Sequence, residues 1–236
     1  MPGARRLLRR YELLISCEHG GNRIPPRYRA AFAKAARALA SHEGYDPGAL
    51  ELAREFARRL DAPFVYSTTS RLLIELNSSL WHPRCFSRFA QRLPNILRSE
   101  IVERYYLPYR DEVKQRVARG LRRGKRVVHL SCHSFTPRLA GIVRHADIGL
   151  LFDPGRAAEA GLCAVWGKAL ARAGLHVRRN YPYKGTADGL TTDLRASFGP
   201  RYLGIEIEVN QRFPKGDAER WRRLRRVLVA TFAKAL

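Results

Sequence analysis

Apolar stretches with strand character alternate along the chain with segments whose apolar residues recur at helical spacing. The expected strands cover 11–16, 63–68, 71–76, 126–132, 147–152 and 202–209. The expected helices cover 26–40, 48–60, 98–119, 155–174 and 216–235. Strands that alternate with helices predict an α/β fold, in which helices cover both faces of a mixed, mostly parallel sheet to make three layers.

The clearest helical patterns are ALELAREFARRL, within 48–60, and DAERWRRLRRVLVATFAKAL, near the end of the chain. One face of each gathers the apolar residues and the other carries charges. These apolar positions are Leu50, Ala53, Phe56, Ala57 and Leu60 in the first helix, and Trp221, Leu224, Leu228 and Phe232 in the second. Asp217 stands near the start of the last helix, where the helix dipole favours an acid.

No linker, repeat or low-complexity segment divides the 236 residues. A chain of this length can bury one large core, so a single domain spanning 1–236 is expected. No apolar stretch approaches the roughly 18 residues that cross a bilayer. The start, MPGARRLLRRYELLIS, has only a short apolar run after its arginines, which predicts a first strand rather than a secretory signal. We therefore expect a cytoplasmic protein.

The cysteines Cys17, Cys85, Cys132 and Cys163 lie far apart and form no CxxC pair. This spacing is not typical of a disulfide framework or a zinc ribbon, and buried free thiols are expected instead.

The formal net charge is +23, from 44 basic and 21 acidic residues. One interpretation is a non-catalytic domain that binds RNA or another polyanion through its basic faces. The basic residues are, however, spread along the whole chain, without a basic tail or an aromatic-rich basic motif. Arginine-rich, solvent-exposed helix faces that help to attract an anionic substrate are the favoured interpretation.

Candidate chemistry gathers where three expected strands end. Glu18 and His19 follow the apolar run YELLIS, and His133 closes the strand within VVHLSCHSFTP. In YLGIEIEVNQ, Glu206 and Glu208 point to the same side because side chains alternate along a strand. Ligands of open α/β sheets bind beyond the carboxyl ends of strands, so these residues can share one site.

Two histidines and a carboxylate form a plausible catalytic zinc shell with an open position for water, and a second carboxylate can then act as general base. For either histidine alone, a hydrogen-bonded and partly buried imidazole explains the pattern as well. The chain has no GxSxG, no P-loop and no GxGxxG, which removes the usual support for lipase-like, nucleotide-hydrolysing and dinucleotide-binding functions.

Seven segments in order resemble the N-formylglutamate amidohydrolase family, from about residue 11 to residue 212. They are ISCEHGGNRIP, GYDPGALELA, SRLLIELNSS, CHSFTP, DIGLLFDP, NYPYKGTADGLT and YLGIEIEVNQ. The resemblance implies a phosphorylase/hydrolase-like α/β domain similar to zinc carboxypeptidases and zinc-dependent muramoyl amidases. It also implies one zinc ion and hydrolysis of the formyl amide of N-formyl-L-glutamate to formate and glutamate.

The same resemblance assigns the metal ligands. It places His19 and His133 as the two histidines. Asp46 is the favoured third ligand because GYDPGALELA opens a helix much as the acidic ligand does in the muramoyl amidases. The His-x-x-Glu pattern of carboxypeptidases points instead to Asn22, a poor zinc ligand. Glu18 stays open, although a neighbouring strand residue faces away from His19.

For the general base, the resemblance favours Glu208 over Glu206; an ion pair with one of the many arginines is the structural alternative. Attack on the amide by a zinc-activated water, with proton transfer through Glu208, is the implied mechanism.

A small anionic amide substrate would bind to cations, since a guanidinium binds a carboxylate through two parallel hydrogen bonds. Arg71 and Arg195 are candidates within the motifs, Lys184 is a third, and Asn77 is expected to orient the substrate or its loop.

One departure concerns the segment after SR, where the family commonly has acid-Leu-Asn-Arg. Here Glu75, Leu76 and Asn77 are followed by Ser78, so one arginine is absent. This bears on the identity of the substrate, and another N-acyl amino acid or a small peptide stays open beside N-formyl-L-glutamate.

Overall fold

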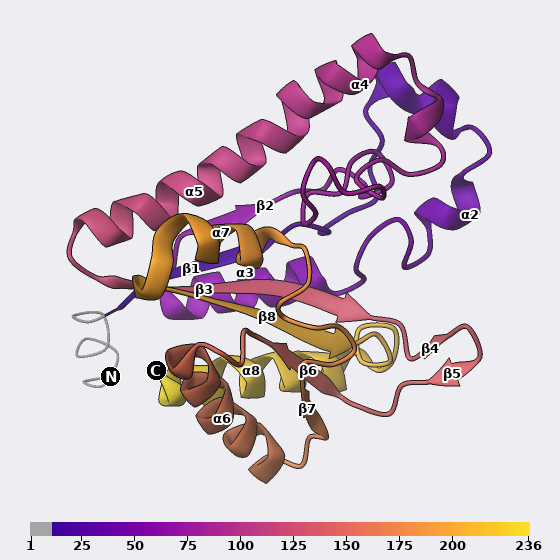
Figure 1. Ribbon diagram of the computed structural model, residues 1–236. Helices are drawn as coiled ribbons and strands as arrows, with labels where there is room; N and C mark the ends of the chain where they lie inside the picture. Colours follow the sequence, from indigo (N-terminus) through magenta and orange to yellow (C-terminus); the bar gives the residue numbers. More distant parts are fainter. Residues whose placement is uncertain (1–10) are drawn as a thin grey trace.

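The fold is organised around a six-stranded sheet, seen in a computed structural model that describes residues 11–236 (Figure 1). The strands are β1 (Tyr11–Cys17), β2 (Phe64–Tyr66), β3 (Arg126–Phe135), β6 (Ile148–Leu151), β7 (Val177–Arg179) and β8 (Tyr202–Asn210), in the spatial order β2-β1-β3-β8-β6-β7. The four strands from β2 to β8 are parallel, β6 is antiparallel to β8, and β7 is parallel to β6. The predicted mixed, mostly parallel sheet is confirmed.

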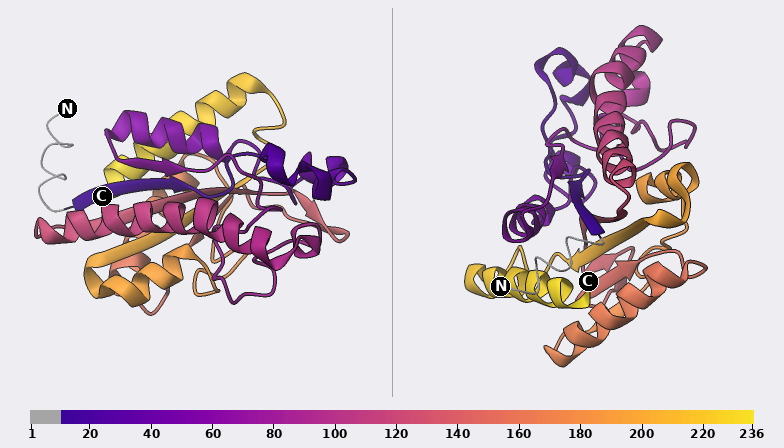
Figure 2. Two further views of the ribbon diagram at one scale, coloured as in Figure 1. Left: turned by 90° about the horizontal axis from the view of Figure 1, so that it is seen from above. Right: turned by 90° about the vertical axis from the view of Figure 1, so that its left-hand side faces the viewer.

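Helices cover both faces of this sheet, which confirms the three-layer α/β fold (Figure 2). On one face lie α3 (Ala49–Leu60), α6 (Ala157–Arg172) and α8 (Ala218–Ala235). On the other face lie α5 (Leu107–Arg122) and α7 (Leu190–Phe198). The small hairpin of β4 (Arg138–Leu139) and β5 (Ile142–Val143) projects beyond the end of β3.

The two faces of the central strands have opposite chemistry, because successive side chains point to opposite sides. Toward α3, α6 and α8 the strands β1, β3 and β8 present the apolar residues Leu13, Ile15, Cys17, Val128, Leu130, Cys132, Leu203, Ile205, Ile207 and Val209. The alternating positions, on the α5 and α7 side, carry buried polar residues, namely Ser16, Glu18, His129, Ser131, His133, Glu206 and Glu208. The apolar face packs one of two hydrophobic cores, while the face toward α5 and α7 combines a second core with the candidate chemistry.

Two expected helices are more irregular than the sequence indicates. The segment 26–40 holds a 3₁₀ helix (Pro26–Phe32) and the short α2 (Ala36–Leu39). The segment 98–119 consists of α4 (Asn95–Ile101), a π-helical stretch (Val102–Tyr106) and α5. Pro108 lies in the first turn of α5 and has no backbone N–H to donate, which accounts for the altered hydrogen bonding before it. Two further 3₁₀ turns cover Ala90–Arg92 and Gly199–Arg201.

The prediction of a strand at 71–76 is wrong, because this segment forms turns outside the sheet. Leu72, Leu73, Ile74 and Leu76 are buried, but they pack in the cluster beneath α5 and the N-terminal 3₁₀ helix. A short apolar run indicates burial more reliably than it indicates a strand. The prediction also missed the hairpin of β4 and β5, the edge strand β7 and the helix α7.

Several smaller expectations concern individual residues. Cys17, Cys85, Cys132 and Cys163 are buried free thiols, as expected. The side chain of Asp217 accepts a hydrogen bond from the backbone N–H of Arg220 and thereby caps α8. Across residues 11–236, no helix combines the length and the apolar character needed to cross a membrane.

We expect Gly149→Ala to destabilise the fold. A Cβ at position 149 in β6 would lie 1.8 Å from the carbonyl oxygen of Tyr181, and the clash is with backbone that cannot rotate away. Overpacking of this kind costs about 2–3 kcal/mol in the free energy of unfolding. Gly161→Ala in α6 is the matched control, since a Cβ there meets no atom within 4 Å and should stabilise the helix by about 0.5–1 kcal/mol. Urea unfolding of both variants measures the difference, and equal stabilities would contradict it.

Candidate active site

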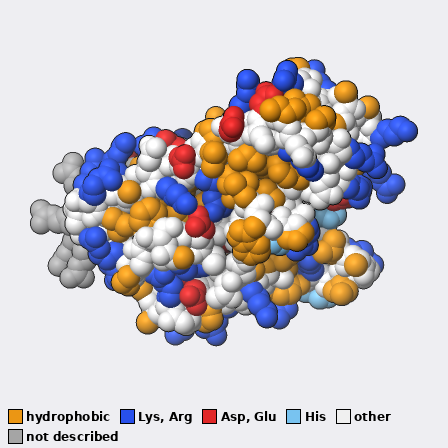
Figure 3. Space-filling model, turned by 45° about the horizontal axis from the view of Figure 1, so that its top comes forward, with side chains coloured by type: hydrophobic (Ala, Val, Ile, Leu, Met, Phe, Trp, Pro, Cys, Tyr) orange, Lys and Arg blue, Asp and Glu red, His pale blue; other side chains and the backbone are white. Residues whose placement is uncertain are grey.

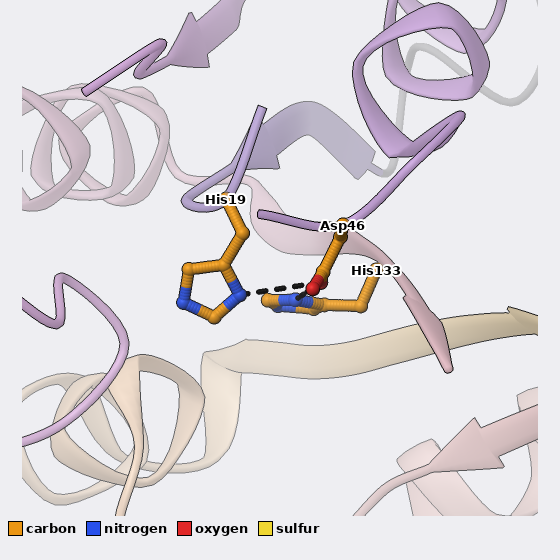
Figure 4. A group of neighbouring side chains, drawn as sticks. All are labelled: His19, Asp46 and His133. Carbon is orange, nitrogen blue, oxygen red and sulfur yellow. Dashed lines mark hydrogen bonds and ion pairs between the residues drawn. The ribbon is translucent and has the colours of Figure 1, made fainter. Parts of the chain in front are cut away.

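Three side chains from separate parts of the chain converge at the carboxyl end of the sheet (Figure 4). His19 follows β1, Asp46 precedes α3, and His133 lies near the end of β3. The Nδ1 atoms of His19 and His133 lie 3.2 and 2.9 Å from the same oxygen, Oδ2 of Asp46. All three side chains are buried, and one nitrogen or oxygen from each lies within 4.8 Å of the others.

Tight turns bring the three residues together. A Cβ at Gly20 or Gly21 would lie 2.7 Å from the carbonyl oxygens of Ser67 and Thr68, so only glycine lets the turn after β1 pack this closely on the segment after β2. The backbone N–H of Asp46 donates to the carbonyl of His19 over 2.9 Å, which ties the two turns to each other.

The far nitrogen of His133 is held by a buried carboxylate. Its Nε2 lies 3.0 Å from Glu18 Oε2 and 2.9 Å from Ser131 Oγ. Tyr109, from α5, donates its hydroxyl to the other oxygen of Glu18 over 2.7 Å. Glu18 therefore fixes the orientation of the imidazole and directs Nδ1 toward Asp46.

His19 has the same arrangement with a different partner. Its Nε2 forms a short contact with Glu75 Oε1, while Arg71 donates to Glu75 Oε2 over 2.7 Å and lies 3.4 Å from Asp46 Oδ1. Each imidazole thus has a carboxylate at its Nε2 and directs its Nδ1 toward Asp46 Oδ2. Carboxylates in this outer position are typical of metal-binding histidines, because they set the tautomer and raise the basicity of the ligating nitrogen.

The electrostatics of the cluster follow from this pairing. Burial opposes charging of His133, but hydrogen bonds with Asp46 and Glu18 outweigh it and raise the pKa of His133 well above its ordinary value. Burial also opposes ionisation of Asp46, yet the two imidazoles and Arg71 hold the pKa of Asp46 below its usual range. Burial and Arg71 oppose charging of His19, but Glu75 and Asp46 outweigh them, so the pKa of His19 is also raised. Both imidazoles therefore favour the protonated form when no metal is bound.

The donor set suits a divalent metal such as zinc, which binds imidazole nitrogen and carboxylate oxygen in catalytic sites. His19, Asp46 and His133 would hold it. Because a ligating histidine must be neutral at the nitrogen that binds, metal binding releases protons and weakens in acid.

A pocket of about 340 Å³ opens onto this cluster. Figure 3 shows histidine side chains at the hollowed edge of the molecule, on the right of that view. Besides the cluster, the pocket is lined by Arg71, Glu75, Asn77, Lys184, Glu206 and Glu208 among others. Glu208 pairs with His133 across the β3–β8 register, which places its carboxylate beside the histidine pair.

Glu208 is the buried acid without a partner. No hydrogen bond or ion pair within residues 11–236 reaches its carboxylate, and Oε2 is fully buried. Burial, supported by the neighbouring charges of Asp46 and Glu206, raises the pKa of Glu208 to about 8 although His133 acts against it. Glu206 also lines the pocket, but its Oε1 accepts a hydrogen bond from Thr191 Oγ1 over 2.7 Å.

The structure brings most of the sequence-predicted residues to the pocket, but not Arg195. Arg195 is buried against α6, where it donates to Glu159 and to the carbonyls of Gly185 and Gly204. Its guanidinium nitrogens donate to groups in α6, β8 and the loop after β7. In this structure Arg195 therefore holds these three segments together and does not face the pocket. Asn22 is likewise outside the cluster and donates to the carbonyl of Leu39.

Several pocket residues were not anticipated from the sequence, among them Glu75, His42, His82 and Arg84. Glu75 stands four residues after Arg71 in the quoted motif, and its contact with His19 was hidden by the expectation of a strand there. Tyr109, which supports Glu18, comes from α5, and no local pattern marks it as part of the site. Glu18 itself supports a histidine rather than joining the three convergent groups.

The fold and site together define a three-layer α/β protein with a carboxylate-linked histidine pair at the edge of its sheet. A profile of the N-formylglutamate amidohydrolase family matches residues 11–213, and the chain belongs to this family. The match confirms the resemblance found in the sequence and places the protein among the amidohydrolases.

Two solved structures share the fold over nearly the whole chain. A gene product of Agrobacterium tumefaciens is 29% identical, with a TM-score of 0.82 over 95% of this chain and 90% of that one. An N-formylglutamate amidohydrolase of Ralstonia eutropha JMP134 is 20% identical, with a TM-score of 0.72 over 95% of this chain and 92% of that one. No curated protein matches the chain significantly.

The raised pKa of Glu208 predicts a pH-dependent stability of the metal-free protein. Between the ordinary value of 4.5 and about 8, the unfolded chain has released this proton while the folded protein keeps it. The protonated carboxyl of Glu208 therefore makes its full contribution to the free energy of unfolding below about pH 4.5, and this contribution is lost as the pH rises through 8. Glu208→Gln should raise the free energy of unfolding at pH 9 by a few kcal/mol, at about 1.4 kcal/mol per pKa unit, and much less at pH 5.

Denaturant unfolding of the metal-free protein at both pH values measures this difference. A gain that is equal at pH 5 and pH 9 would show that the buried carboxylate is not protonated at neutral pH.

Tyr109→Phe should weaken metal binding without removing a ligand, because Glu18 then loses the donor that positions it behind His133. Loss of a carboxylate that contacts the ligand directly, as Glu18 does, typically costs 10- to 100-fold in metal affinity, so removing only its supporting hydroxyl should cost about tenfold or less. Tyr105→Phe, the same change in the π-helical stretch just before α5, is the control, since no described residue hydrogen-bonds its hydroxyl. Competition with a chelating dye measures both affinities, and equal values would show that Tyr109 does not support the site.

Proposed function

We propose that the protein hydrolyses a linear amide, N-formyl-L-glutamate or a related N-acyl amino acid, with one zinc ion held by His19, Asp46 and His133. The observation that carries the proposal is the convergence of two imidazole nitrogens and a carboxylate oxygen in a pocket that also holds the unpaired acid Glu208. Membership of the amidohydrolase family supports the type of reaction. One domain spanning 1–236 carries the whole activity in this proposal.

When bound, the metal would supply Lewis acidity, which lowers the pKa of water and polarises an amide carbonyl. Glu18 and Glu75 hold the far nitrogens of the two histidines, so that both rings stay turned toward Asp46. This arrangement directs both Nδ1 atoms toward the carboxylate that would share the cation with them.

Glu208 is the general base of the proposed reaction. Its buried and unpaired carboxylate can accept a proton from the attacking water and pass it to the leaving nitrogen. Its pKa of about 8 describes the protein without a metal, and the charge of a nearby cation would favour the ionised form that a base requires. Glu206, with one oxygen occupied by Thr191, is the alternative base.

The remaining pocket residues bind the substrate. Arg71 and Lys184 are the cations proposed for its carboxylates, although Arg71 already pairs with Glu75 and Asp46. Asn77 has a constrained position, because its Oδ1 accepts from the backbone N–H of Leu190 over 2.9 Å. Its side-chain amide nitrogen is therefore the group left to orient the substrate.

The basic surface does not favour the non-catalytic alternative. Lysine and arginine side chains are scattered over the face in Figure 3 rather than gathered into one groove. The family and structural comparisons give no support for an RNA-binding function. Salt-sensitive nucleic-acid binding by a protein that holds no metal would favour that alternative. The cytoplasmic location expected from the sequence stays a prediction.

Metal analysis combined with a panel of N-formyl and N-acetyl amino acids tests the proposal. The purified protein should contain one zinc per chain, and His19→Ala should lose both the metal and the hydrolysis. Glu208→Gln should keep the metal while the turnover rate falls by about 10²–10⁴-fold, the usual contribution of a general base. Unchanged hydrolysis by a metal-free His19→Ala protein would exclude the mechanism.

A further inference from the structure

Arg144 is an unpaired cation beside the pocket. It follows β5, and its guanidinium carbon lies 6.0 Å from the ring centre of Phe135 and 5.6 Å from that of Tyr183. Both rings line the pocket. The aromatic rings hold the guanidinium in place and leave its hydrogen-bonding capacity unused.

The described residues provide no acceptor for this guanidinium. Within residues 11–236, no carboxylate or carbonyl accepts a hydrogen bond from the Arg144 side chain, and its Nη1 is fully buried without a partner. Buried donors in native proteins are almost always paired, so an orphaned guanidinium nitrogen requires an explanation. A bound anion next to it provides one, because the guanidinium fork matches a carboxylate.

The backbone around Arg144 is fixed to the strand that carries the proposed base. Its N–H donates to the carbonyl of Pro137 over 2.8 Å, and its own carbonyl accepts from Asn210 Nδ2 over 3.0 Å. Asn210 ends β8, two residues after Glu208. The position of Arg144 relative to Glu208 is therefore set by the sheet rather than by a free loop.

The other arginines singled out in the motifs are already neutralised. Arg71 pairs with Glu75 and Asp46, and Arg195 is occupied by Glu159 and two carbonyls. Lys184 lines the pocket next to Tyr183 and has no side-chain partner among residues 11–236. Within residues 11–236, no carboxylate pairs with the side chain of Arg144 or Lys184, and both adjoin Tyr183, whose ring lines the pocket. Arg84 also lines the pocket without a carboxylate partner among these residues, but it makes no contact with either ring that Arg144 packs against.

We propose that Arg144, together with Lys184, forms the subsite that binds a carboxylate of the amino-acid part of the substrate. The inference rests on the proposed amide hydrolysis and adds the residue that selects acidic substrates. In this proposal the amide of the substrate lies next to Glu206 and Glu208, and its carboxylate lies against Arg144 and Lys184.

The first test is the preference for acidic over neutral substrates. Hydrolysis of N-formyl-L-glutamate is compared with that of its neutral diamide, N-formyl-L-glutamine amide, in wild type, Arg144→Gln and Lys184→Gln. We expect KM for the acid to rise about tenfold or more in Arg144→Gln, with kcat within about twofold and the diamide unaffected. Arg144→Lys should recover part of the loss, because it restores the charge without the fork.

Arg138→Gln is the matched control, since it removes the same charge from the same hairpin at an exposed position that, unlike Arg144, contacts neither of the pocket-lining rings of Phe135 and Tyr183. The subsite would be overturned if Arg144→Gln raised KM equally for the acid and the diamide. It would also be overturned if KM for the acid were unchanged in both Arg144→Gln and Lys184→Gln. Lys184→Gln keeps the test decisive if Arg144→Gln fails to fold.

A binding measurement separates this inference from the proposed reaction. Calorimetric titration with L-glutamate requires no hydrolysis, so it reports on the subsite whichever amide the protein cleaves. Binding that weakens about tenfold in Arg144→Gln but not in Arg138→Gln supports the subsite. Equal binding of L-glutamate by Arg144→Gln and Arg138→Gln, or no detectable binding by the wild-type protein, would overturn the subsite. Failure to cleave any amide would reject the proposed function alone.

Discussion

The contact of Asp46 with both His19 and His133 is the interaction on which the site depends. Each imidazole is buried, neighbouring carboxylates raise its pKa, and one carboxylate oxygen of Asp46 contacts both rings. Because the three residues come from the end of β1, the loop before α3 and the end of β3, this contact also joins three segments of the chain. A divalent cation held by these three residues would displace protons from the imidazoles, because a ligating nitrogen must be unprotonated.

The sheet divides stability and chemistry between its two faces. The apolar side of β1, β3 and β8 packs on α3, α6 and α8 as one hydrophobic core, and a second core lies under α5 and α7. The opposite side buries a row of hydroxyls, imidazoles and carboxylates, which is tolerated because nearly every group has a partner. His129, for example, contacts Tyr202 on one side and Ser16 on the other. Glu208 is the exception in this row, and an unpaired buried acid at a pocket is typical of a functional group.

Arginines in this protein illustrate how one residue type takes different roles. Arg195 joins α6 to β8 by using its donors on buried acceptors, Arg71 neutralises the two acids next to His19, and Arg144 is left without an acceptor between two rings. The role of each arginine is set by the hydrogen-bond acceptors that the fold places next to it. Net charge alone therefore says little about where an anion binds.

The sequence by itself determined the layered α/β fold and much of the site's composition. Hydrophobic periodicity is local, so it located most strands and helices, and the abrupt polar strand ends identified His19, His133 and Glu208. The convergence of these residues with Asp46 followed from family resemblance and is seen in the structure. Only the tertiary structure decided that 71–76 leaves the sheet to place Glu75 behind His19, that Tyr109 supports Glu18, and that Arg195 is internal. Those roles depend on which partner each side chain meets across long sequence separations, and no local pattern records that choice.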